Sequence, residues 1–120
     1  MTTTRQERVK ELLKLEISDI IRREMKDPRL GFITVTDAQV TADLQHAKVF
    51  VSILGDEAQK KESMKVLQKA AKFIRSGFAK RANMKTTPEI VFMMDTSVDQ
   101  GVRIFELLEK IKKEDVGEGT

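Results

Sequence analysis

The sequence predicts an α+β protein in which helices pack on a three-stranded sheet. Two observations carry this prediction. Apolar residues recur every three or four positions over three long segments, and short segments of β-branched or continuous apolar residues lie between them. The predicted order is helix, strand, strand, a helical region with a break, strand and helix. A chain of 120 residues has the size of one domain with one core.

The first helix is expected to begin at Thr4, because Thr4-Arg5-Gln6-Glu7 has the spacing of a capping box. Apolar residues then follow at helical spacing from Val9 to Ile21. Asp27-Pro28 is expected to close this segment, since the residue before a proline is pushed out of the α region.

Three segments are expected to form the sheet. Residues 32–36 and 47–53 are rich in β-branched residues and alternate in polarity, so they predict an antiparallel hairpin joined by residues 41–46. Residues 90–94 form a continuous apolar run, which predicts a third strand buried on both faces. This third strand is expected to be the most protected one.

Residues 57–84 are expected to be helical, with an apolar stripe that includes Leu67, Ile74 and Phe78. Gly77 weakens the interior of this helix, so we expect a kink or a break between residues 70 and 78. A second capping box at residues 97–100 precedes a final amphipathic helix. We therefore expect one domain over residues 1–112 and a flexible tail over residues 113–120.

Positive charge is concentrated in residues 60–85, which carry nine lysines and arginines against one acid, Glu62. The net charge of this segment is +8, although that of the whole chain is only +3. A solvated helix face is the simplest explanation of surface lysines. However, like charges four residues apart repel each other, so a face with so little acid is better explained by an anionic partner. Nucleic acid is the first candidate, because neutralised phosphates release counterions.

Other compositional features narrow the function. The six aromatic residues are all Phe, and most fall on apolar faces, so we expect recognition of RNA shape and backbone rather than base stacking. The chain has no Cys and a single histidine, His46, which gives no basis for a metal site, and no cofactor is expected. Asp95, Ser97 and Asp99 have no histidine base nearby and suit helix capping, so no enzyme is predicted.

Location and partners follow from similar absences. No apolar run approaches the length of a membrane span, and the N-terminus lacks the apolar region of a secretory signal. We therefore expect a cytoplasmic protein with no membrane partner and no small-molecule substrate, acting as a monomer.

The element order is that of a type II KH domain with an added C-terminal helix, but the chain lacks the Gly-x-x-Gly loop of ordinary KH domains. A more specific resemblance is to bacterial ribosome-binding factor A, over roughly residues 4–112. The motifs that carry it are Arg8-Val9, Asp27-Pro28-Arg29, Ala70-Ala71-Lys72-Phe73-Ile74-Arg75-Ser76, Lys85-Thr86-Thr87-Pro88-Glu89-Ile90-Val91-Phe92, Asp95-Thr96-Ser97 and Gly101-Val102-Arg103-Ile104.

In that family a helix-kink-helix with an Ala-x-Gly sequence replaces the KH loop. The matching residues here are Ala70, Ala71 and Lys72, so a lysine stands in place of the glycine. The resemblance implies a kink at these residues, either shallower than in the family or displaced towards Gly77. It also implies a nonenzymatic assembly factor that binds the free immature 30S subunit through 16S rRNA, promotes its late maturation and rRNA processing, and has a role in cold adaptation.

The residues expected to contact RNA form two groups. Those of the helix-kink-helix are Lys61, Lys65, Lys69, Lys72, Arg75, Lys80, Arg81 and Lys85. A peripheral group near the end of the first helix consists of Arg22, Arg23, Lys26 and Arg29, for which interaction with the helix C-terminus is a sufficient structural explanation. Two alternatives remain open at this point: a KH-like binder of other structured RNA, and a helical protein-interaction module.

Overall fold

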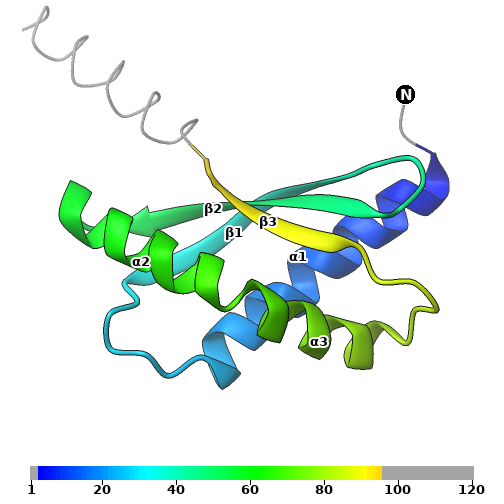
Figure 1. The fold of residues 1–120 in the computed structure, drawn as a ribbon. Coiled ribbons are helices and arrows are strands. Elements are labelled where there is room, and N and C mark those ends of the chain that lie inside the picture. Colours follow the sequence, from blue (N-terminus) through cyan, green and yellow to red (C-terminus); the bar gives the residue numbers. More distant parts are fainter. Residues whose placement is uncertain (1–2, 96–120) are drawn as a thin grey trace, which may run out of the picture.

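Three helices cover one face of a three-stranded sheet in the computed structural model, which describes residues 3–95 (Figure 1). The elements are α1 (Thr4–Glu24), β1 (Phe32–Val40), β2 (His46–Leu54), α2 (Glu57–Lys69), α3 (Ala71–Ala82) and β3 (Glu89–Met94). The predicted α+β class, element order and break between two helices are confirmed. The predicted helix after residue 97 and the predicted tail at 113–120 lie outside the described residues.

The sheet has the strand order β1-β2-β3. β1 and β2 form the predicted antiparallel hairpin, whereas β2 and β3 are parallel. The prediction that the third strand is buried on both faces was wrong. β3 is an edge strand whose side chains alternate, with Ile90 and Phe92 buried and Val91 and Met93 exposed. A continuous apolar run therefore does not distinguish a doubly covered strand from an edge strand with one uncovered apolar face.

The first helix begins at Thr4 as expected, but its N-cap is Thr3 and its capping box is Thr3 with Gln6 rather than Thr4 with Glu7. Thr3 is the N-cap, and its hydroxyl accepts a hydrogen bond from the backbone N–H of Gln6, whose side chain accepts one from the N–H of Thr3. Gln6 is buried and also donates from Nε2 to the carbonyl of Val40, at 2.9 Å. This second contact explains why Gln6, rather than Glu7, supplies the side chain of the capping box.

The ends of two other elements also differ from the prediction. α1 ends at Glu24, with Met25 already extended, so the helix stops before Asp27-Pro28. β1 continues to Val40, beyond the predicted residue 36, because a register irregularity between Val35 and Asp37 lets the strand continue its pairing with β2.

A single core lies between the helices and the sheet. The side chains of Leu13, Ile17 and Ile20 from α1 meet Val49 and Val51 of β2 in this core. Leu67 of α2, Ile74 and Phe78 of α3 and Phe92 of β3 complete it. Because each large apolar side chain contributes about 1.5–3 kcal/mol when fully buried, this core is the main source of stability.

Within residues 3–95, no helix combines the length and the apolar character that a membrane crossing requires.

Candidate nucleic-acid interface

The break between α2 and α3 falls at Ala70. Its backbone leaves the helical range with ψ near 1°, and its N–H still donates to the carbonyls of Val66 and Leu67 at the end of α2. Its own carbonyl accepts from the N–H of Ile74 at 2.9 Å, which starts α3. The break therefore coincides with the predicted kink residues Ala70, Ala71 and Lys72, and it exists without a glycine there.

Gly77 has a different role from the predicted one. It lies inside α3, and the helix continues through it. A Cβ atom at this position would lie 3.2 Å from Cδ1 of Ile20 in α1. Gly77 therefore allows α1 and α3 to approach closely, and the displacement of the kink towards this residue is not observed.

A set of exposed lysines follows the outer sides of α2 and α3. We call this set the lysine face, and it consists of Lys61, Lys65, Lys69, Lys72 and Lys80, with Lys85 in the loop after α3. In the part of the chain that the structure describes, these six side chains form no ion pair at 4.0 Å or less. The nearby carboxylate of Glu62 lies 3.9 Å from Arg29 instead. Their charge is therefore available to a partner.

Arg81, in contrast, is held by carboxylates. Its guanidinium donates to Asp19 at 2.5 Å, to Glu16 at 3.2 Å and to Glu24 at 3.3 Å, all on α1. Its side chain is only 25% exposed. Hydrogen bonds from Arg81 and then Arg22 lower the pKa of Asp19 to about 2. Arg81, which sequence reasoning grouped with the RNA contacts, thus joins α3 to α1.

Arg75 also has a defined role within the fold. Its side chain donates to the carbonyls of Thr87 at 2.8 Å and Pro88 at 3.2 Å. These bonds fix the segment between α3 and β3, which carries Lys85. Although Arg75 is exposed, its guanidinium thus orders the loop beside the lysine face.

In the peripheral group near the end of α1, the three arginines are bound to carboxylates, whereas the lysine has no ion pair within residues 3–95. Arg22 and Arg23 both contact Asp19, at 2.9 and 2.8 Å. Arg29 binds Asp27 through two side-chain hydrogen bonds and one backbone hydrogen bond, and these lower the pKa of Asp27 to about 2. Lys26 is exposed and has no ion pair within residues 3–95.

The structure brings this loop next to the helix break. A shallow hollow is lined by Lys26 and Arg29 from the loop after α1, by Lys69 and Ala70, and by Phe73 at the start of α3. Sequence reasoning did not join these two segments, because they lie about forty residues apart in the chain and meet only through tertiary packing. The hollow extends the lysine face towards the end of α1.

The prediction that the phenylalanines serve mainly as core residues was only partly right. Phe78 and Phe92 are buried, but Phe73 is 53% exposed and Phe32 is 76% exposed. Phe105 lies outside the described residues. Because Phe73 borders the hollow with two lysines, an aromatic surface is available beside positive charge, and the composition argument against base stacking does not apply there.

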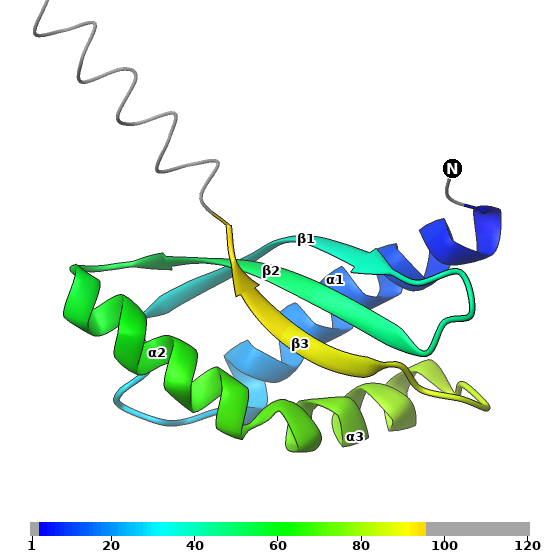
Figure 2. The same ribbon diagram turned by 45° about the horizontal axis from the view of Figure 1, so that its top comes forward.

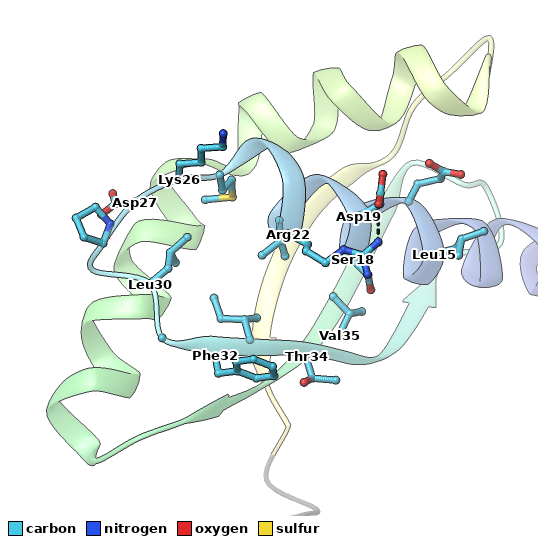
Figure 3. A pocket seen from close by; sticks show the side chains of 16 residues that line it. Leu15, Ser18, Asp19, Arg22, Lys26, Asp27, Leu30, Phe32, Thr34 and Val35 are labelled. Atoms are coloured by element: carbon cyan, nitrogen blue, oxygen red, sulfur yellow. Dashed lines mark hydrogen bonds and ion pairs between the residues drawn. The ribbon is translucent and has the colours of Figure 1, made fainter.

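A broader hollow lies between α1 and β1 (Figure 3). Two of its labelled charged pairs are internal, since Arg22 is hydrogen-bonded to Asp19 and Asp27 binds Arg29, whereas the labelled Lys26 has no ion pair within residues 3–95. The remaining lining is largely apolar and includes Leu15 and Leu30. It offers no pair of free titratable groups suited to acid–base chemistry.

No cluster of three or more metal-ligating side chains exists among residues 3–95. His46 is exposed at the start of β2, with Nδ1 3.7 Å from Glu89. Asp95 accepts a hydrogen bond from Thr36, whereas Ser97 and Asp99, which were predicted to cap a helix with it, lie outside the described residues.

The fold, with a helical break where a KH domain has its Gly-x-x-Gly loop, defines the class as an α+β protein of KH-like topology. A crystal structure of ribosome-binding factor A from Thermus thermophilus has this fold, with a TM-score of 0.66 and 22% identity over 74% of this chain and 94% of that one. A homology model of the Thermus thermophilus factor, fitted into a cryo-electron microscopy map of a 30S–ribosome-binding factor A complex, gives a TM-score of 0.63 and 23% identity, over 72% and 91% of the two chains.

The sequence comparisons are more specific. The family model of ribosome-binding factor A matches residues 5–108. Ribosome-binding factor A of Halothermothrix orenii is 55% identical over 115 residues, which cover 96% of this chain and 94% of that protein. The chain belongs to the ribosome-binding factor A family.

Proposed function

We propose that the protein is an assembly factor that binds the free immature 30S subunit through 16S rRNA, with the lysine face as its main contact surface. The observation that carries this proposal is the set of six exposed cations without ion pairs in the described structure, beside a helix break of the kind expected in the family. Membership of the family and the 30S complex of the Thermus thermophilus relative support the choice of partner.

Lysine contacts recognise phosphate positions rather than base sequence. Each contact that replaces condensed counterions adds affinity and makes that affinity depend on salt. Lysine is suited to this role because its ammonium group is a compact charge on a flexible stem. A rigid domain with several such contacts favours the RNA arrangement whose phosphates match them, since a ligand shifts an equilibrium by its differential affinity.

Phosphate binding of this kind also accounts for a role in the maturation of the subunit. The protein promotes late maturation and rRNA processing by stabilising one arrangement of 16S rRNA, and it acts by binding, without catalysis of its own. A need for the protein at low temperature follows if misfolded RNA arrangements escape more slowly in the cold. The protein acts as a monomer, and its partner makes the cytoplasm its site of action.

The contacts that we propose are not equal. Lys61, Lys65, Lys69, Lys72, Lys80 and Lys85 are the primary contacts. Lys26 extends this surface through the hollow at the helix break. Arg22, Arg23 and Arg29, which are bound to carboxylates, are secondary contacts, and Arg75 and Arg81 act mainly by holding the elements that carry the lysines.

The test is co-sedimentation of the purified protein with immature 30S, mature 30S and 50S subunits, each at low and moderate salt. We expect selective binding to immature 30S that weakens as salt is raised, because phosphate contacts release counterions. Equal binding to all particles would leave a binder of structured RNA in general. Binding that does not respond to salt would favour a protein-docking module over the proposed RNA contact.

A further inference from the structure

The sheet has a second face that the three helices do not cover. Figure 3 shows Phe32 and Thr34 of β1 pointing away from α1, while Val35 points towards it. On the same open face, Phe32 and Leu54 are each 76% exposed, Val91 is 53% exposed and Met93 is 40% exposed. The alternation of buried and exposed positions in β2 and β3 matches this assignment.

The exposed apolar side chains form a patch with two parts. Phe32 pairs with Leu54 across the hairpin, and Phe50 pairs with Met93, which lies two residues after Val91 on β3. The polar pair of Thr34 and Ser52 lies between the two parts. Several large apolar side chains on one uncovered face of a soluble protein mark a surface that something covers.

The end of the described chain lies over this face. After β3, the N–H of Asp95 donates to the carbonyl of Val51 at 2.8 Å, and Thr36 of β1 donates from its hydroxyl to a carboxylate oxygen of Asp95 at 2.5 Å. β1 and β3 are not neighbours in the sheet, so this bond crosses β2. Figure 2 shows the end of β3 passing over β2 towards β1. The chain thus leaves the sheet on its open side.

The sequence that follows Asp95 contains apolar residues spaced as in an amphipathic helix. Twenty-five residues follow Asp95, and they include an apolar set at helical spacing: Val102, Ile104, Phe105, Leu107, Leu108 and Ile111. We propose that residues 97–112 form a helix that docks its apolar side on the open face of the sheet. This inference is independent of ribosome binding.

Length and attachment favour the chain's own segment over a separate partner. A helix of this length spans about 24 Å, and a nine-residue strand spans about 30 Å, so one helix covers most of the patch. The short connection after Asp95 gives the segment a high effective concentration at the patch. The lysine face is a poorer acceptor, because it offers charge to the acids of the segment but no apolar surface to its leucines.

The absence of cysteine allows a direct test, since one introduced thiol carries a spin label at one site. The label is placed on the open face with Thr34→Cys, and in a matched control on α3, in the helical layer, with Ser76→Cys, both at exposed positions. The readout is paramagnetic broadening of the amide resonances of residues 98–111 in the full-length protein. We expect strong broadening from position 34 and little from position 76.

Two further samples complete the test. In the Thr34→Cys background, Phe105→Glu is expected to abolish the broadening, because a buried carboxylate opposes docking. Equal broadening from both label positions, or greater broadening from position 76, would overturn the proposal. Broadening of an unlabelled ¹⁵N chain by a separate spin-labelled chain would also overturn it, since a second copy would then be the occupant.

Discussion

The lysine face and the α1–α3 contact are both rich in positive charge, but they use it differently. Lys80 and Arg81 are adjacent in α3, yet Lys80 is exposed without an ion pair in the described structure, whereas Arg81 is surrounded by Glu16, Asp19 and Glu24. Arginine can bridge several carboxylates because its planar guanidinium presents five donors. The comparison teaches that net charge in a sequence does not measure charge that is available to a partner.

The largest expected effect is on binding through the lysine face. Charge reversal in Lys65→Glu/Lys69→Glu/Lys72→Glu is expected to reduce affinity for the immature 30S subunit by at least about 100-fold, since three phosphate contacts become repulsive. Affinity is measured by sedimentation over a salt series, and folding by circular dichroism. Arg5→Glu/Arg8→Glu/Lys48→Glu changes the net charge equally on other surfaces and serves as the control. If both triple variants bind equally well, the lysine face is not the contact surface.

The next effect is on the contact between α1 and α3. Gly77→Leu is expected to lower the free energy of unfolding by about 1–3 kcal/mol, because a side chain there meets Ile20 at close range. Urea unfolding measures this change. Ser76→Leu, at the exposed neighbouring position, is the control and is expected to change stability little. Equal stability of the two variants would show that the helices separate without cost.

The pair Lys80→Ala and Arg81→Ala sharpens the comparison most directly. Lys80→Ala is expected to leave the melting temperature unchanged and to reduce the slope of log affinity against log salt by about 1. Arg81→Ala is expected to lower the melting temperature because Glu16, Asp19 and Glu24 of α1 lose their contact with α3, with a smaller change in the salt slope. Calorimetry and sedimentation separate the two outcomes. The opposite pattern would exchange the roles of the two residues.

The smallest expected effect concerns acid stability. Since the pKa of Asp19 in the folded protein is about 2, below its ordinary value of 3.8, its contribution to stability is complete above that ordinary value and is lost as pH falls towards 2. Arg81→Ala is expected to raise the pKa of Asp19 and to make stability fall less steeply over this interval. Carboxyl NMR titration follows the pKa, and urea unfolding at several pH values follows the stability. An unchanged pKa would assign the shift to Arg22 and Arg23.

Local patterns predicted the elements of the fold well. Helical spacing and β-branched composition gave the order from α1 to β3, and the cluster of lysines pointed to α2 and α3. The ends of the elements were less predictable, because they depend on tertiary partners. The choice of Thr3 over Thr4 as N-cap depends on Gln6 reaching Val40, which lies 34 residues away in the sequence.

The candidate site was predicted in outline but not in its division of roles. Nothing in the local sequence separates Lys80 from Arg81, because the acids that bind Arg81 all come from α1. The pair of Asp19 and Arg23 lies within α1, so the spacing of four residues is compatible with it, but no such spacing relates Asp19 to Arg81. Likewise, the exposure of Phe73 depends on where the helix break and the loop after α1 meet.

The bond from Gln6 to Val40 has a consequence for the order in which the protein opens. Gln6 joins the first turn of α1 to the end of β1, where the hairpin connection begins. Fraying of this turn therefore leaves the half-buried Val40 without this hydrogen bond to its carbonyl, and opening of the hairpin removes a partner from Gln6 in the helix cap. We therefore expect the two segments to open as one cooperative unit, with amides that exchange with solvent deuterium together rather than at the separate rates of a free helix end and a free strand end.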